Sequence, residues 1–301
     1  MKKELLIILF IGFVFNLYAQ SVDPLKTKDA KMQTIWVDSI MKNMTLDEKI
    51  GQLFMVQAYS NKDEKHADFI TEMIKEYHVG NLIFMQGTPE KQAELNNRYQ
   101  DAAKVPLMIG FDGEWGLDMR LKNTYRFPWN MTLGAIRNDS LIKEFGEHLG
   151  KHCKRLGIHI NFAPVVDINT NPENPIIGNR SFGENKENVT KKAIAFTQGM
   201  QSQGVLANAK HFPGHGDTAS DSHHTLPVLN FDMGRLDSIE LYPYKKVFDA
   251  GITSVMTAHL SVPSLESDNR LPTSLSKNVV TNLLQQKLGF LGLVITDGLN
   301  M

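Results

Sequence analysis

The sequence predicts an α/β fold in which a parallel sheet closes into a TIM-type (β/α)8 barrel. Short apolar runs rich in branched residues recur along the chain, and longer segments with helical spacing of apolar positions lie between them. Strands that follow one another through helical crossovers pair in parallel. A doubly wound dinucleotide fold is the alternative, but no glycine-rich G-x-G-x-x-G turn follows the first run. The pattern therefore favours the barrel.

Seven strands are expected, one at each apolar run: 51–57, 80–85, 107–112, 158–163, 205–211, 252–258 and 293–297. Helix-start signals stand between them, among them a Thr-Leu-Asp-Glu capping box at 45–48 and Asn138 before an amphipathic segment that ends at Leu156. In such barrels the chemistry sits at the carboxyl ends of the strands. Four polar residues fall at those ends: Asp112, Lys210, His211 and Asp297.

The end of the sequence does not fit a complete barrel. The chain stops at Met301, four residues past Asp297 and before an eighth strand. We therefore expect a barrel truncated after the seventh strand, formed by one domain over residues 20–301. A barrel that lacks its last strand has two open edges, so we expect this piece alone to fold poorly.

The first nineteen residues predict a signal peptide. Lys2 and Lys3 precede an apolar run over 5–15, and the small residue Ala19 precedes a polar segment. The apolar run is about half of the roughly 20 residues that a spanning helix needs, so a cleaved segment is favoured over a membrane anchor. The sequence thus predicts an exported protein, periplasmic or extracellular.

Composition excludes some classes of function. Lys and Arg total 32 against 33 for Asp and Glu, so no global positive field is present to hold a nucleic-acid backbone. The single cysteine, Cys153, can form neither an intramolecular disulfide nor a cysteine metal cage. We expect it to be a small buried residue on a helix.

The stretch 210–217 followed by 221–224 concentrates four His and two Asp with Pro and Gly. Pro213, Gly214 and Gly216 disfavour a regular helix and predict a shaped loop after a strand. A solvated polar loop is one interpretation. A zinc site is another, although the histidines do not share a helical face and H-E-x-x-H is absent.

Acid-base catalysis is the third interpretation. In the Asp221-x-His223 pair, a carboxylate can fix the tautomer of an imidazole and raise its proton affinity, so His223 could protonate a leaving oxygen. An attacking group is also needed. Asp297 ends the seventh predicted strand, and Gly298 leaves room beside it. A helix N-cap is the alternative role for Asp297.

Other residues could bind a ligand. Asp112 could accept two hydroxyl hydrogen bonds, and Arg120 and Arg180 could donate charge-assisted ones, although each could equally form a structural ion pair. Trp115 and Trp129 could stack on a sugar ring, but core packing is the favoured role of both.

Together these segments resemble glycoside hydrolase family 3, and most closely its β-N-acetylglucosaminidase-like branch. The resemblance spans the chain after residue 19 and rests on four motifs: Asp-Gly-Glu-Trp-Gly at 112–116, Asn-Arg-Ser-Phe-Gly at 179–183, the stretch 210–217 with Asp-Ser-His at 221–223, and Val-Ile-Thr-Asp-Gly-Leu-Asn-Met at 294–301. The Asp-x-His loop is typical of this branch, whereas related β-glucosidases take their acid/base from a second domain.

The resemblance implies a role for each site residue. Asp297 is the expected nucleophile, His223 the acid/base and Asp221 its partner. The expected sugar contacts are Asp112, Arg120, Arg180, Lys210 and His211. No metal or other cofactor is implied, and the expected partner is a carbohydrate that carries N-acetylglucosamine. A further C-terminal domain is expected in some family members.

The expected activity is retaining exo-hydrolysis of a terminal β-linked N-acetylglucosamine. The alternatives are a β-glucosidase, a phosphorolytic relative, a metal-dependent hydrolase, and a sugar-binding barrel without catalysis. Chelation, added phosphate and binding without turnover distinguish the last three.

Overall fold

The computed structural model describes residues 23–222 and 225–301. Seven strands form one sheet, all parallel and in the order of the sequence. Their bounds are β1 Met55–Ala58, β2 Asn81–Phe84, β3 Met108–Phe111, β4 Ile160–Asn161, β5 Leu206–Phe212, β6 Ser254–Thr257 and β7 Leu293–Thr296. The predicted α/β class with a barrel-like parallel sheet is confirmed. The predicted signal peptide, 1–19, lies outside the described residues.

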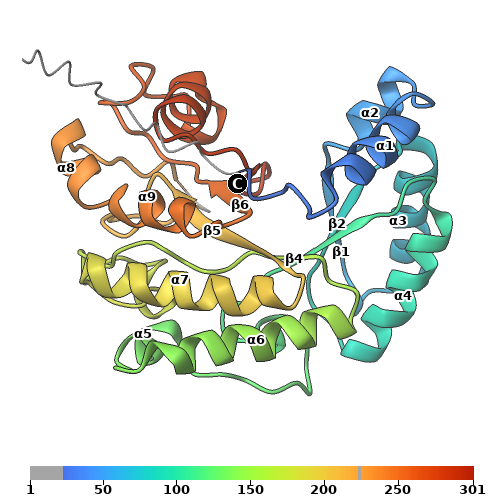
Figure 1. Ribbon diagram of the computed structural model, residues 1–301, viewed down its shortest axis with the longest axis horizontal. Coiled ribbons are helices and arrows are strands. Elements are labelled where there is room, and N and C mark those ends of the chain that lie inside the picture. Colours follow the sequence, from blue (N-terminus) through green and yellow to red (C-terminus); the bar gives the residue numbers. More distant parts are fainter. Residues whose placement is uncertain (1–22, 223–224) are drawn as a thin grey trace, which may run out of the picture.

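Helices connect the strands and lie around the outer side of the curled sheet (Figure 1). The α-helices are α1 Ala30–Met41, α2 Leu46–Gly51, α3 Glu64–Tyr77, α4 Pro89–Ala102, α5 Asn130–Gly134, α6 Asp139–Arg155, α7 Lys186–Ser202, α8 Met233–Ser238 and α9 Tyr242–Asp249. Shorter 3-10 turns are η1 Leu117–Met119, η2 Gly178–Arg180 and η3 Thr273–Leu275, and η4 Asn278–Lys287 is a π-helix. None of the helices described here combines the length and the apolar content needed to cross a membrane.

Both faces of the sheet are apolar. Alternate residues of a strand point to opposite faces, and the outward set, including Leu82 and Val255, packs against the helices. The inward apolar cluster contains one residue from each strand: Met55, Ile83, Met108, Ile160, Leu206, Met256 and Ile295. This layer corresponds to the packed interior of a TIM-type barrel. Within the described strands no pairing joins β7 to β1, so the sheet has two open edges.

One predicted strand is wrong in its bounds. The run 51–57 was expected to be a strand, but α2 ends at Gly51 and β1 begins only at Met55. The cause is the capping box: the Thr45 hydroxyl accepts from the Glu48 amide at 3.2 Å, and the Glu48 carboxylate accepts from the Thr45 amide at 2.7 Å. A helix therefore starts here and uses the first residue of the apolar run. The run still overlaps β1 at 55–57, and the other six runs each overlap a strand.

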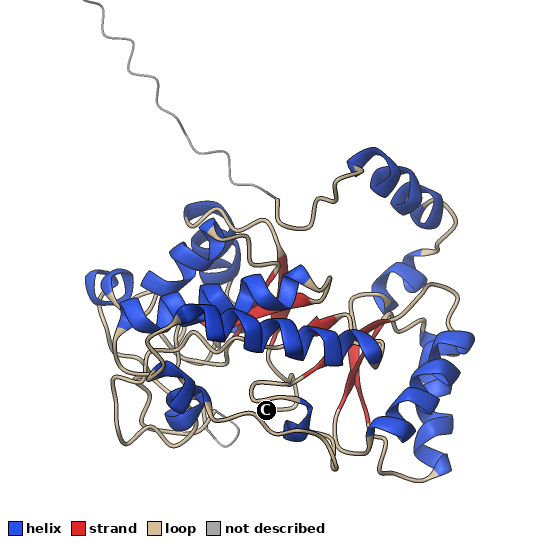
Figure 2. Cartoon of the chain, turned by 60° about the horizontal axis from the view of Figure 1, so that its bottom comes forward, coloured by secondary structure: helices blue, strands red, loops and turns tan. Residues whose placement is uncertain are grey.

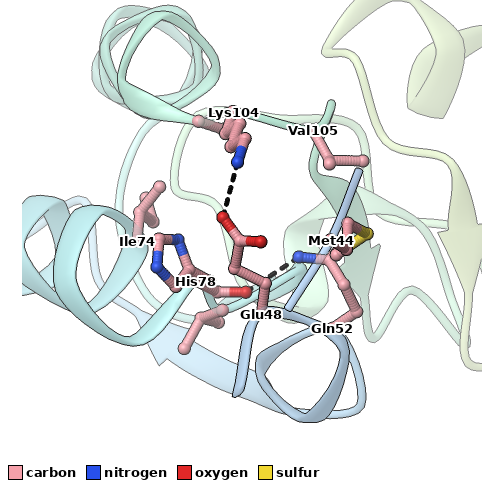
Figure 3. A pocket seen from close by; sticks show the side chains of 9 residues that line it. Met44, Glu48, Gln52, Ile74, His78, Lys104 and Val105 are labelled. Carbon is pink, nitrogen blue, oxygen red and sulfur yellow. Dashed lines mark hydrogen bonds and ion pairs between the residues drawn. The ribbon is translucent and has the colours of Figure 1, made fainter. Parts of the chain in front are cut away.

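Glu48 also ties α2 to the segment after α4. The Nζ of Lys104 lies 2.6 Å from Oε1 of Glu48, in a small hollow that includes Ile74 and His78 (Figure 3). The hydrogen bond from Lys104, reinforced by the Thr45 amide, lowers the pKa of Glu48 to about 2. Because both carboxylate oxygens are used in these contacts, we assign the hollow a structural role.

The predicted helix after Asn138 is confirmed. The Asn138 side chain accepts from the Ser140 amide at 3.1 Å and caps α6, which ends at Arg155. Cys153 lies on the buried face of α6, and burial raises the pKa of its thiol to about 12. The thiol is therefore an apolar core group, as expected, and not a reactive one. Figure 2 shows the helices packed against the strands from a second direction.

Candidate active site

A cavity of about 950 Å³ opens at the inner side of the curled sheet. Phe162 and Met256 contribute apolar surface to it. The cavity is also lined by the predicted nucleophile and by all the predicted sugar contacts: Asp112, Arg120, Arg180, Lys210, His211 and Asp297. The structure therefore brings together six residues that span 186 positions of the sequence.

Asp112 directly follows β3 and is held by two cations. Arg120 Nη2 lies 2.6 Å from Oδ2, and Lys210 Nζ lies 3.0 Å from Oδ1. Burial alone would raise the pKa of Asp112, but the charges of Lys210 and Arg120 outweigh it and hold the pKa below its ordinary value. Asp112 is thus an ionised acceptor at the cavity wall.

The backbone beside Asp112 is fixed by β4. Asn161, fully buried, accepts from the Gly113 amide at 2.8 Å and donates to the Gly113 carbonyl at 3.3 Å. A Cβ at position 113 would lie 3.2 Å from the Asn161 oxygen, so glycine permits this close approach. The two strand ends therefore set the direction of the Asp112 side chain.

Glu114, which the sequence interpretation did not assign to the site, is the most buried carboxylate of the cavity wall. Arg180 binds both of its oxygens, with Nε 3.0 Å from Oε2 and Nη2 2.8 Å from Oε1. Lys210 Nζ lies 2.8 Å from Oε1. Burial opposes ionisation, but the charges of Arg180 and Lys210 hold the pKa of Glu114 far below its usual range. The sequence could have indicated Glu114, because it stands two residues after Asp112 at the end of the same strand.

His211 is oriented by Asp167, a second residue that the sequence interpretation missed. Its Nδ1 lies 2.6 Å from Asp167 Oδ2, and its Nε2 lies 3.2 Å from Arg180 Nη2. An arginine can only donate, so Nε2 accepts and Nδ1 carries the proton. His211 is therefore a neutral imidazole in this state. An acid soon after the fourth predicted strand was the available signal for Asp167.

The charges of this cluster balance. Three carboxylates, Asp112, Glu114 and Asp167, face three cations, Arg120, Arg180 and Lys210. All six are at least partly buried. A balanced polar wall of this kind suits an uncharged ligand with many hydroxyl groups, because such a ligand can exchange hydrogen bonds with it without adding charge.

Asp297 directly follows β7 and lies in the same cavity. Its amide donates to the Thr257 carbonyl at 2.9 Å, and its Oδ1 accepts from the Gly298 amide at 2.8 Å. These two contacts attach it to the end of β6 and to its own turn. Asp297 Oδ2 has no hydrogen-bond partner among the residues that the structure describes.

The predicted acid/base lies partly outside the structure. His223 is not among the described residues. Asp221 is half-buried, and its carbonyl accepts from the Thr225 amide at 3.1 Å. Ser222, which stands between them in the sequence, lines the same cavity as Asp297.

The two tryptophans do not line this cavity. Trp115 and Trp129 pack against each other with ring centroids 4.2 Å apart, and the Arg126 guanidinium lies 4.9 Å from the Trp129 ring. Packing, the favoured role of both rings, therefore fits the structure.

The four ring nitrogens of His211 and His215 are already used. Those of His211 bind Asp167 and Arg180, and those of His215 bind Thr218 and Ser222. Within residues 23–222 and 225–301, no three His, Cys, Asp or Glu side chains form a group suited to a metal ion. The ring nitrogens of His211 and His215 are thus already hydrogen-bonded within the protein.

Comparisons with known proteins find relatives among the glycoside hydrolases. The family model described as the glycosyl hydrolase family 3 N terminal domain matches residues 45–301. A "Beta-hexosaminidase A" of Pseudoalteromonas piscicida is 35% identical over 255 residues, which are 77% of this chain and 43% of that protein. This chain therefore spans about half the length of such curated relatives.

Solved structures show the same similarity. A glycoside hydrolase family 3 β-N-acetylglucosaminidase from Paenibacillus sp. str. FPU-7 is 41% identical with a TM-score of 0.80, over 86% of this chain and 50% of that one. The β-glucoside phosphorylase BglX is 27% identical with a TM-score of 0.85, over 94% of this chain and 51% of that one.

Proposed function

This chain belongs to glycosyl hydrolase family 3, and on that premise we propose that it carries the active site of a retaining exo-glycosidase. The proposed reaction releases a terminal β-linked N-acetylglucosamine. The observation that carries the proposal is the shared cavity, which is lined by Asp297 and by Asp112, Lys210 and Glu114 of the charge-balanced cluster. The names of the β-hexosaminidase relatives support the choice of sugar.

In the proposed first step, an Asp297 oxygen attacks the anomeric carbon while the bond to the leaving oxygen breaks. The His223 imidazolium gives its proton to that oxygen, and Asp221 is the proposed partner that stabilises the imidazolium. The product is a glycosyl ester of Asp297. Two inversions at the same carbon are needed for retention, so a second step follows.

In that second step, water attacks the anomeric carbon and the ester bond to Asp297 breaks. The neutral His223 takes the proton of the water, which restores the imidazolium. Asp112, Arg120, Arg180, Lys210 and His211 are the proposed contacts to the sugar hydroxyl groups. An imidazole donor adds no second negative charge beside Asp297, unlike the carboxyl pair of most glycosidases.

The test uses the intact protein and an aryl β-N-acetylglucosaminide. We expect the wild type to release the aryl group with a β-configured sugar as first product, and Asp297→Asn to be inactive. An inactive wild type, or an Asp297→Asn variant that keeps its activity, rejects the assignment. Circular dichroism of both proteins shows whether the variant is folded.

Phosphorolysis is a second candidate, favoured by the likeness to the β-glucoside phosphorylase. In that reaction phosphate replaces water as the acceptor and the product is a sugar 1-phosphate. Product analysis with and without phosphate separates the two reactions. A chelator added to the same assay tests the metal-dependent alternative, which predicts loss of activity.

We also propose that the protein is exported after cleavage behind Ala19. The charge and apolar pattern of residues 1–19 supports this proposal. Mass determination of the protein purified from its native cells tests it, because an intact Met1 would contradict cleavage.

A further inference from the structure

His215 is a buried imidazole whose two ring nitrogens have partners of opposite kind. Thr218 donates its hydroxyl proton to the His215 carbonyl at 3.0 Å, so the same hydroxyl oxygen can only accept elsewhere. It lies 2.6 Å from His215 Nδ1, which must therefore carry the proton. Nε2 is then an acceptor, and the Ser222 hydroxyl, 3.1 Å away, donates to it.

The backbone of His215 is held from two other segments. Its amide donates to Asp167 Oδ1 at 2.7 Å. Its carbonyl accepts from the Asn174 side chain at 2.8 Å. The next residue, Gly216, approaches the chain so closely that a Cβ there would lie 1.9 Å from the Ile168 carbonyl oxygen. These contacts thus fix the His215 backbone to the polypeptide that follows β4.

Ser222 is the residue that His215 holds through the hydrogen bond to Nε2. Its side chain is buried, at 6% exposure, and lines the cavity that contains Asp297. In the sequence it stands between Asp221 and His223, the proposed acid/base pair. A hydrogen bond at Ser222 therefore restrains the described segment that ends at Ser222 and contains Asp221.

We propose that His215 is a positioning residue, which accepts the Ser222 hydroxyl and thereby holds the segment 217–222, which carries Asp221, the proposed partner of the acid/base His223. This inference rests on the proposed function, because it assigns His215 a part in the delivery of the proton. His215 itself offers no unused ring nitrogen to a sugar, which distinguishes it from a catalytic residue.

Nε2 of His215 can accept a hydrogen bond at the pH values at which most enzymes work. Burial lowers the pKa of His215 to about 4. The ring is therefore neutral at neutral pH and Nε2 keeps its lone pair for Ser222. The groups that face the ring are Thr218, Ser222 and the edge of His211, with Asp167 beneath its amide.

The test exploits the leaving group of the substrate. A phenyl β-N-acetylglucosaminide needs protonation of its leaving oxygen, whereas the 2,4-dinitrophenyl compound leaves without it. The quantity compared is kcat/KM, because it reports the steps up to the first irreversible bond cleavage. For Ser222→Ala in the intact protein, we expect kcat/KM to fall about 10- to 100-fold for the phenyl substrate. For the dinitrophenyl substrate we expect a change below about twofold, since it requires no general acid.

Ser220→Ala is the matched control. Ser220 lies in the same loop, is half-buried, and its hydroxyl has no hydrogen-bond partner among the residues that the structure describes. We expect neither substrate to respond to this change. A second pair of variants addresses the other side of the bond: His215→Phe removes the acceptor, whereas His215→Gln keeps an oxygen that can accept from Ser222. We expect His215→Gln to recover part of the phenyl activity that His215→Phe loses.

Equal losses on both substrates for Ser222→Ala would overturn the proposal, because a purely structural defect does not depend on the leaving group. Unchanged activity on both would overturn it as well. If the wild type hydrolyses neither substrate, the proposed function fails and this inference fails with it. If the wild type is active but Ser222→Ala shows no selective defect, only this inference fails.

Discussion

Arg180 binds both carboxylate oxygens of Glu114, 66 residues away in the sequence, with its Nε and Nη2 at 3.0 and 2.8 Å. The Glu114 side chain is fully buried, and Lys210 approaches the same carboxylate. This pair joins the loop after β3 to the turn η2. It places two cations around one anion in the wall of the cavity.

We expect Glu114→Gln to destabilise the protein by about 3 to 5 kcal/mol, because it leaves buried cations without their shared anion. The change keeps the shape of the side chain, so the loss reports charge. Chemical denaturation of the intact protein measures it. Glu94→Gln is the control: Glu94 is 66% exposed and pairs with Lys91 on one helix face, so its loss should stay within about 0.5 kcal/mol. Similar losses for both variants would contradict the role of Glu114.

We expect Asp112→Asn to lower kcat/KM about 10- to 100-fold, since a hydrogen bond to a charged group contributes roughly 1.5 to 3 kcal/mol. Steady-state assays with an aryl β-N-acetylglucosaminide measure the change. Asp118→Asn in the same loop is the control. Asp118 does not line the cavity, and its ion pair with Arg126 is long, with 3.9 Å between Oδ2 and Nε. An Asp112→Asn variant with wild-type kinetics would remove Asp112 from the sugar contacts.

We expect the free energy of unfolding to decrease as the pH falls from about 6.5 to about 4, with a contribution from His215 of about 3 kcal/mol. The unfolded chain binds a proton at His215 below about pH 6.5, but the buried ring has its pKa lowered to about 4. Between these values the unfolded state holds more protons, so acid favours it.

Denaturation curves of the wild type and of His215→Gln across this pH range isolate the contribution. The variant should show a shallower dependence on pH, because glutamine does not titrate. Parallel curves for the two proteins would show that His215 is protonated alike in both states. Below about pH 4, Asp112, Glu114 and Asp167, all with lowered pKa values, should add a further loss of stability.

We expect Thr45→Ala to cost about 1 kcal/mol, because it removes the side-chain half of the capping box at the start of α2. A shift of the melting temperature by about 2 to 4 °C would correspond to this loss. Thr34→Ala is the control: Thr34 is exposed in the middle of α1, where alanine favours the helix. That variant should be within about 0.5 kcal/mol of the wild type, and a larger loss than that of Thr45→Ala would contradict the assignment.

Much of the architecture follows from local patterns. Apolar runs and helix-start signals placed all seven strands, with the start of β1 four residues too early, and the start of α6. The rule that barrel chemistry lies at the carboxyl ends of strands selected Asp112, Lys210, His211 and Asp297, and all four line one cavity. The error at β1 arose because an apolar run does not by itself distinguish the end of a helix from the start of a strand.

The amino-acid sequence by itself determined which residue types stand at the strand ends, because strand position and strand direction are encoded locally. Only the tertiary structure decided which charges meet. Lys210 reaches Asp112 across 98 residues, and Asp167, Glu114 and His215 acquire their partners only when β3, β4 and β5 lie side by side. The physical reason is that buried ions and imidazoles take their protonation state and orientation from neighbours within about 3 Å, and that neighbourhood exists only after the sheet has curled.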